Sequence, residues 1–157
     1  MGSSESTASV GTRSDSLPFL NGDANSVTMS GFSGGCFMAH EMSIIYPSDI
    51  QGVVLTSCWN YGDKATLASA STATELKDAS VGLMTPNESA GLIGSTSDIA
   101  NQKVFMWVGS DDTATPPVGM EAADLLYQEY GATTDYTEEA GYGHELADDG
   151  EIIMEGL

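Results

Sequence analysis

The feature that most constrains the fold is a G-x-S-x-G pattern at 31–35, between a β-prone run and an apolar, helix-compatible segment. In a strand–turn–helix this tight, the central Ser33 is strained, and the flanking Gly31 and Gly35 lack side chains that would collide. The turn presents the Ser33 hydroxyl at the carboxyl end of the strand and the Gly34 N–H at the positive end of the helix. The pattern predicts an acyl-transfer nucleophile with one oxyanion donor, although G-x-S-x-G also arises by chance in Gly/Ser-rich chains.

Length, composition and charge restrict the class of protein. At 157 residues, with 41% hydrophobic and 17% charged residues, the chain is long enough for one globular domain. Its 23 acidic and 4 basic residues give a net charge of −19, which repels nucleic acid, phosphorylated ligands and anionic membranes. A neutral ester is a better partner. No apolar run reaches the ~18 residues of a membrane span, and we expect neither a metal nor another cofactor.

The composition divides the chain into three parts. Residues 1–16 are Ser/Gly-rich with almost no large apolar side chains, and we expect them to be disordered. Residues 17–146 carry the strand and helix patterns of a single domain. Residues 147–157 form an acidic tail.

Strand-like and helix-like segments alternate through the domain, which predicts an α/β fold with a mostly parallel sheet of about four strands and flanking helices. The helix after Ser33 is apolar on most sides and is expected to be buried. The Ala/Ser-rich stretch 62–100 is expected to pass over one edge of the sheet. The expected strands are 27–30, 52–58, 103–108 and 133–139, and the expected helices are 35–46, 65–77 and one from Pro116 to the C′ residue Gly131.

The second expected strand is followed by Trp59, Asn60 and Tyr61, at the end of the sheet where α/β proteins bind ligands. These residues are candidates for a substrate cleft, and they are equally compatible with closing the edge of a core. Cys36 and Cys58 have no metal-ligand spacing, and a disulfide between them is about as well supported as two buried thiols.

The chain holds two histidines. His40 lies on the helix after Ser33, roughly 10 Å along its axis at 1.5 Å per residue, which is too far for its imidazole to reach the hydroxyl. His144 lies in a glycine-containing loop just after the fourth expected strand, from which an imidazole can reach the serine. We therefore assign His144 as the general base and then acid.

The acid is expected after a strand end and before the histidine in the chain. Asp111 and Asp112 both follow the third expected strand, and we prefer Asp112 with Asp111 as the alternative. Its carboxylate accepts the Nδ1 proton of His144, fixes the tautomer and stabilises the imidazolium.

The stretches 25–39 and 104–113, with the later His144, resemble fungal and bacterial poly(3-hydroxybutyrate) (PHB) depolymerases of the circularly permuted α/β-hydrolase type. The likeness covers about residues 17–146, and the family pattern G-x-x-D-T falls on Asp112. It implies a secreted, extracellular serine esterase in which Ser33, Asp112 and His144 cleave a polyester or a short hydroxyalkanoate ester.

The chain also departs from this family. There, the remaining central strands and the loop with the second oxyanion donor follow the histidine, and no second donor is identifiable here. The resemblance therefore covers only the first half of a depolymerase. It implies an uncovered sheet edge, through which the chain can self-associate. The alternative function is a weakly active or inactive hydrolase-like fragment that serves as a binding domain.

Overall fold

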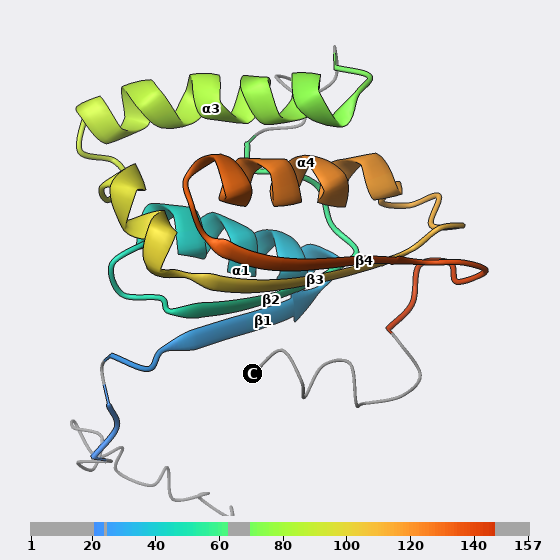
Figure 1. The fold of residues 1–157 in the computed structure, drawn as a ribbon, viewed down its shortest axis with the longest axis horizontal. Coiled ribbons are helices and arrows are strands. Elements are labelled where there is room, and N and C mark those ends of the chain that lie inside the picture. The colour runs from blue at the N-terminus through green and yellow to red at the C-terminus, as the bar shows by residue number, and fades with distance from the viewer. Residues whose placement is uncertain (1–20, 24, 63–69, 147–157) are drawn as a thin grey trace, which may run out of the picture.

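The structure, a computed structural model, describes residues 21–23, 25–62 and 70–146. These form a four-stranded parallel sheet in the order β1-β2-β3-β4 (Figure 1). The strands are β1 (Thr28–Phe32), β2 (Gly52–Thr56), β3 (Lys103–Gly109) and β4 (Thr133–Glu139). The predicted fold class is thereby confirmed. The segments 1–16 and 147–157, which were predicted to be disordered and an acidic tail, lie outside the described residues.

Two helices cover one face of the sheet (Figure 1). α1 (Gly34–Ile45) packs on β1 and β2, while α4 (Pro117–Glu129) packs on β3 and β4. Alternate strand residues point into the layer between sheet and helices, as the period of two in a strand requires. This layer is the main core and includes Val53, Leu55, Val104, Met106 and Val108 from the strands and Ala39, Ile44, Met120 and Leu126 from the helices.

The expected burial of α1 on most sides is wrong. Cys36, Ala39, His40, Ser43 and Ile44 are buried against the sheet, but the Met38 side chain is 60% exposed. An apolar helix is buried only where another element packs on it, and within the described residues α1 contacts chiefly β1 and β2.

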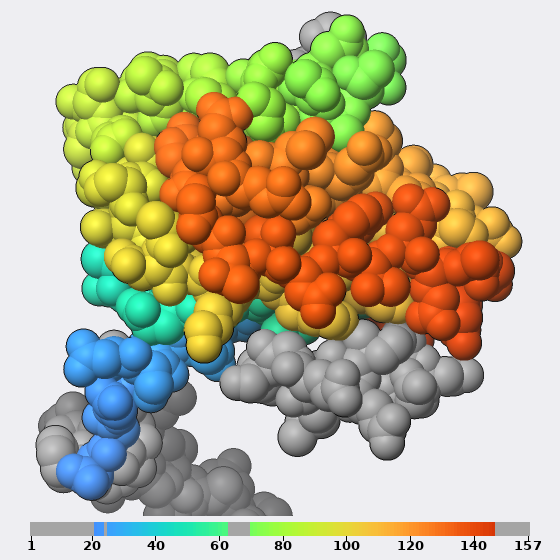
Figure 2. All heavy atoms as spheres, in the orientation of Figure 1, coloured from blue at the N-terminus to red at the C-terminus, as the bar shows by residue number. Residues whose placement is uncertain are grey.

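The helix expected at 65–77 is wrong in its bounds where the structure describes it: residues 70–72 are not helical, and α3 spans Ala73–Ser89. Residues 65–69 lie outside the described residues. The start of α3 is set by a capping box, in which the Thr72 hydroxyl accepts from the Glu75 N–H and the Glu75 carboxylate accepts from the Thr72 N–H. α3 packs along α4 rather than over a sheet edge, and so forms a third layer (Figures 1 and 2). The short 3₁₀ helix η1 (Thr96–Asn101) then leads into β3.

α4 is buried on two sides because it lies between the sheet and α3. Met120, Ala123, Leu126 and Tyr127 belong to the main core, whereas Ala122 joins Leu76 of α3 in a second cluster. The expected C′ glycine, Gly131, has a φ of 84°, which is the left-handed conformation that ends such a helix.

The two outer strands of the described sheet differ in charge. β4 carries Asp135, Glu138 and Glu139, and charged side chains of this kind discourage pairing with another chain. β1 has no charged residue. Self-association therefore stays a prediction, and β1 is the edge on which we expect it. None of the helices in the described ranges is long and apolar enough to cross a membrane.

Candidate active site

The turn that joins β1 to α1 holds Ser33 in a strained backbone conformation, with φ 54° and ψ −118°. A Cβ atom on Gly31 would lie 2.2 Å from the carbonyl carbon and oxygen of Gly35, so only glycine fits there. A Cβ on Gly35 would meet nothing within 4 Å, and the expected steric need for Gly35 is therefore wrong. The Ser33 N–H donates to the Thr56 carbonyl at 3.0 Å, which ties the turn to the end of β2.

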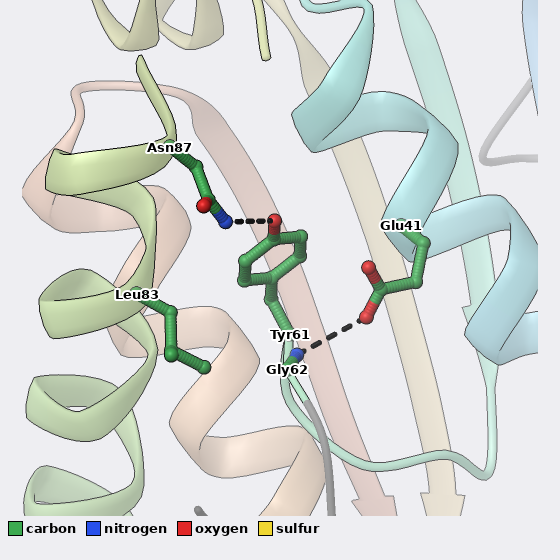
Figure 3. A pocket seen from close by; sticks show the side chains of 5 residues that line it. All are labelled: Glu41, Tyr61, Gly62, Leu83 and Asn87. Carbon is green, nitrogen blue, oxygen red and sulfur yellow. Dashed lines mark hydrogen bonds between the residues drawn. The ribbon is translucent and has the colours of Figure 1, made fainter. Parts of the chain in front are cut away.

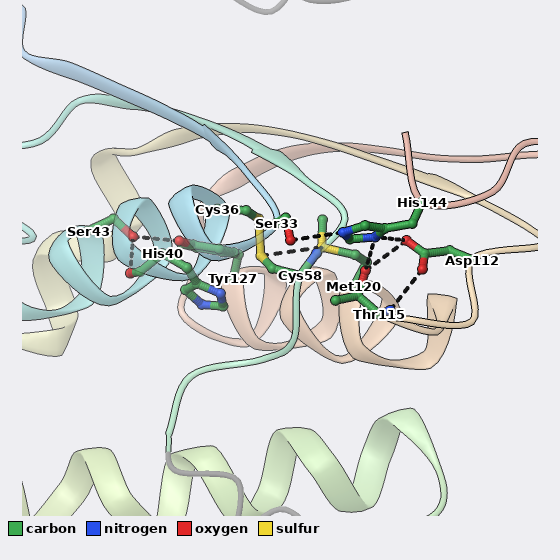
Figure 4. The surroundings of a disulfide bond; sticks show 10 residues. All are labelled: Ser33, Cys36, His40, Ser43, Cys58, Asp112, Thr115, Met120, Tyr127 and His144. Atoms are coloured by element: carbon green, nitrogen blue, oxygen red, sulfur yellow. Dashed lines mark hydrogen bonds and ion pairs between the residues drawn. A yellow bond between two sulfur atoms is a disulfide. The ribbon is translucent and has the colours of Figure 1, made fainter. Parts of the chain in front are cut away.

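A disulfide joins Cys36, in the first turn of α1, to Cys58, just beyond β2 (Figure 4). Of the two alternatives left open by the sequence, the structure contains the disulfide. The two Cα atoms are 5.7 Å apart, and both residues are fully buried. The Cys58 N–H also points at the Met120 sulfur of α4, at 3.4 Å. The start of α1, the end of β2 and α4 are thus held together directly beside Ser33.

Three predicted residues from distant parts of the chain meet at the carboxyl ends of the strands. The Ser33 Oγ lies 2.8 Å from His144 Nε2, and His144 Nδ1 lies 2.8 Å from Asp112 Oδ2 (Figure 4). With Asp112 ionised, Nδ1 carries the proton that the carboxylate accepts, and Nε2 is free to accept from the serine hydroxyl. The arrangement is that of a nucleophile, a base and an orienting acid.

The carboxylate of Asp112 is fixed by its own turn. Oδ1 accepts from the N–H groups of Ala114 at 2.9 Å and Thr115 at 2.8 Å, and Oδ2 accepts from the Thr115 hydroxyl at 2.7 Å. Burial works to raise the pKa of Asp112, but the Thr115 N–H, His144, the Thr115 hydroxyl and the Ala114 N–H outweigh it and hold the pKa below its usual value. Asp111 is exposed and accepts from the Ser110 hydroxyl instead. The geometry favours Asp112 over Asp111 as the partner of His144.

The loop that carries His144 packs closely on the end of β3. A Cβ atom on Gly109 would lie 2.2 Å from the Tyr142 carbonyl oxygen, and the Asp111 N–H donates to that same oxygen at 2.9 Å. Trp107 meets the Tyr142 ring edge-on, with centroids 5.8 Å apart, and the Phe32 ring lies 4.9 Å from the imidazole. These contacts position the imidazole of His144 without burying it deeply, since its side chain is 27% exposed.

The expected oxyanion donor, Gly34, is exposed at the start of α1, and its N–H has no acceptor within the described residues. It is the residue directly after Ser33 and begins α1, one residue before the expected helix start at 35. Its role in binding an oxyanion stays a prediction. The described ranges contain no cluster of side chains able to hold a metal ion.

The structure places Trp59, Asn60 and Tyr61 against α3. Asn60 is fully buried and donates to the Leu76 carbonyl, while Trp59 packs on the second core cluster. Tyr61 lies in a pocket between α1 and α3, where Asn87 donates to its hydroxyl at 3.4 Å (Figure 3). Within the described residues, no hydrogen bond joins any of the three to Ser33, Asp112 or His144. A substrate-binding role for the three stays a prediction.

The other histidine, His40, lies inside the core, where it stacks on Tyr127 with ring centroids 5.2 Å apart (Figure 4). Burial lowers the pKa of His40 to about 4, although the nearby Trp59 backbone opposes this shift. Neither ring nitrogen has a hydrogen-bond partner of good geometry among the described residues. His40 is therefore a neutral core residue at neutral pH and is separate from the His144 site.

This burial predicts a specific acid sensitivity. Between pH 6.5 and 4 the unfolded chain binds a proton at His40 while the folded chain does not, so stability falls as the pH falls. We expect His40 alone to remove about 3 kcal/mol of the free energy of unfolding over this range. Urea unfolding at several pH values should show a shallower loss for His40→Phe, which keeps an aromatic ring beside Tyr127 but cannot titrate. Equal pH slopes in the two proteins would contradict the prediction.

Sequence reasoning missed Thr115, which is buried and contacts two of the three candidate catalytic side chains. The signal was present as Asp112-x-x-Thr115 directly before Pro116, a spacing at which Asp and Thr side chains bond within one turn.

No protein-family model matches the sequence, and no curated protein gives a significant match. Among solved structures, the chain is similar to the PHB depolymerase from Penicillium funiculosum, with a TM-score of 0.62 and 23% identity over 78% of this chain and 40% of that chain. A PHB depolymerase complexed with R3HB trimer gives a TM-score of 0.62 and 22% identity, over 81% and 43% of the two chains. The Bacillus cereus carboxylesterase gives 0.57 and 17%, over 85% and 49%.

These similarities show the class of fold. The chain has an α/β-hydrolase fold, as the sequence resemblance implied, and it is partial. It spans 40–49% of the length of these three solved structures.

Proposed function

We propose that the chain is a carboxylic ester hydrolase of the PHB depolymerase type, with Ser33 as nucleophile, His144 as base and Asp112 as the orienting acid. The observation that carries the proposal is the continuous hydrogen-bonded path from Ser33 Oγ to His144 Nε2 and from His144 Nδ1 to Asp112 Oδ2, with both distances 2.8 Å. A nucleophile, a base and an orienting group within this reach of one another are the geometric requirement for acyl transfer.

The reaction proceeds in two halves. Ser33 Oγ attacks the ester carbonyl carbon while its proton passes to His144 Nε2, and the carbonyl oxygen becomes an oxyanion to which Gly34 N–H donates. The ester C–O bond then breaks, and the imidazolium gives its proton to the departing alkoxide. Water next attacks the acyl-enzyme, with His144 as base again, and releases the carboxylic acid and free Ser33.

Charge supports a polyester or hydroxyalkanoate ester as the substrate class. An ester is neutral, so a chain of net charge −19 does not repel it on approach. Cleavage creates a carboxylate, which the same surface repels. The solved PHB depolymerase that is complexed with R3HB trimer also supports short hydroxybutyrate esters as the first substrates to test.

Two measurements test the proposal on the unmodified protein. We expect hydrolysis of p-nitrophenyl butyrate, followed by hydrolysis of hydroxybutyrate oligomers. A fluorophosphonate probe should label the protein once, and mass spectrometry of the digested product should place the adduct on Ser33. Absence of both hydrolysis and labelling would overturn the proposal, as would an adduct on a different serine.

One observation favours a second candidate function. The chain spans less than half of the solved structures it resembles, and the described residues offer no identified second oxyanion donor beside Gly34. Loss of one such donor costs about 10²–10³ in rate. The alternative is therefore a weakly active or inactive hydrolase-like fragment that binds esters without efficient turnover. Labelling of Ser33 without measurable ester hydrolysis would favour this alternative.

A further inference from the structure

Thr115 contacts both ends of the hydrogen bond between Asp112 and His144 (Figure 4). Its hydroxyl oxygen lies 2.7 Å from Asp112 Oδ2 and 3.2 Å from His144 Nδ1, and only 6% of the residue is exposed. Its backbone N–H donates to the other carboxylate oxygen, Oδ1, at 2.8 Å. Both oxygens of Asp112 are thus held by one residue.

Counting protons fixes the direction of these bonds. The ionised carboxylate can only accept, so the single proton of the Thr115 hydroxyl goes to Asp112 Oδ2. The Nδ1 proton of His144 is then shared, with Oδ2 as the near acceptor and the Thr115 oxygen as the far one. Asp112, His144 and Thr115 form a closed three-membered set of hydrogen bonds.

We infer that Thr115 is a positioning residue of the acid–base pair. It holds the Asp112 carboxylate in the one orientation that meets His144 Nδ1, and it draws part of the carboxylate charge away from the imidazole. The catalytic part of this inference rests on the proposed function. The part that concerns the imidazole belongs to the resting protein and is independent of turnover.

The other charged groups around Asp112 and His144 are the same in the wild type and in each Thr115 variant. Asp111 accepts from the Ser110 hydroxyl, Glu139 from the Trp107 indole N–H, and Glu145 from the Gly143 N–H. All three are carboxylates, and substitution of Thr115 leaves them in place. A change in proton binding on substitution is then attributable to the missing hydroxyl.

The test compares Thr115→Val with Thr115→Ser and with the matched control Thr113→Val. Valine keeps the shape of threonine without the hydroxyl, serine keeps the hydroxyl, and Thr113 is an exposed residue of the same turn. With one donor fewer, the carboxylate holds the imidazolium proton more tightly. We expect Thr115→Val to lower kcat/KM about tenfold, the scale of one hydrogen bond to a charged group. The acid limb of its pH–rate profile should move to higher pH.

The same shift should appear without any substrate, in the NMR titration of the His144 C2 proton, assigned with the help of His40→Phe. Thr115→Ser and Thr113→Val should titrate and react like the wild type. A lower melting temperature in Thr115→Val with neither the NMR midpoint nor the acid limb moved would show a merely structural role and overturn the inference. If the valine variant does not fold, Thr115→Ala gives the same comparison.

The two proposals fail separately. An NMR shift in Thr115→Val, in a protein without esterase activity, would support the positioning role and contradict the proposed function. If the protein is an active esterase but Thr115→Val changes neither the NMR midpoint nor the pH profile, the proposed function is supported and the positioning role is contradicted.

Discussion

Replacement of Ser33 by alanine is expected to reduce kcat for p-nitrophenyl butyrate about 10⁶-fold, the scale seen when a triad nucleophile is removed. In the proposed mechanism, the Ser33 Oγ, which lies 2.8 Å from His144 Nε2, is the oxygen that forms the bond to the acyl carbon. His144→Ala should cost nearly as much, because without the base the hydroxyl keeps its proton.

A double variant, Ser33→Ala with His144→Ala, tests whether the two residues act together or contribute independently. The double variant should be no slower than either single variant, since the two residues act as a unit. Ser30→Ala is the matched control, because Ser30 is an exposed serine of the same strand, and it should keep wild-type activity. Substantial activity in Ser33→Ala, or losses that multiply in the double variant, would contradict the assigned roles.

The second large effect is expected from Gly31→Ala. The new Cβ would be placed 2.2 Å from the Gly35 backbone and 2.6 Å from the Cys36 nitrogen, and no backbone can yield that much without reshaping the turn. A displacement of about 1 Å at the nucleophile is enough to cost roughly 10²-fold in rate. We expect at least that loss in kcat/KM, together with a lower melting temperature.

Gly35→Ala provides the comparison within the same motif. Its Cβ would meet nothing within 4 Å, so the variant should fold normally and keep most of its activity. The sequence pattern treats the two glycines alike, whereas the structure distinguishes them. Equal losses from both substitutions, measured by kcat/KM and by thermal unfolding, would contradict the steric difference between Gly31 and Gly35.

The sequence predicted the parallel sheet and the meeting of Ser33, Asp112 and His144, because these depend on local signals. Strand-length runs alternate with helices, and each of the three residues lies in the turn or loop that follows a strand. In a parallel sheet all such ends lie along one edge, so the order of the elements already implies that the residues lie near one another.

The errors arose where packing partners decide the outcome. Helix α3 lies in a stretch of small residues with little apolar periodicity. The helix is stabilised by packing on α4, a contact that no local sequence pattern indicates. Met38 is apolar but exposed. The prediction missed this because composition does not tell which face of α1 meets the sheet. Thr115 was missed because its proposed role depends on contact with His144, which comes from a distant part of the chain.

The bond between Cys36 and Cys58 also bears on the environment in which the chain can work. Such bonds persist in secreted and periplasmic proteins and are removed by the thiol pools of the cytosol. In an oxidising environment, the disulfide would therefore keep the first turn of α1, directly after Ser33, covalently linked to the end of β2. A chain produced in a reducing cytoplasm is expected to carry Cys36 and Cys58 as free thiols. Thiol reductants should be left out of the purification buffers.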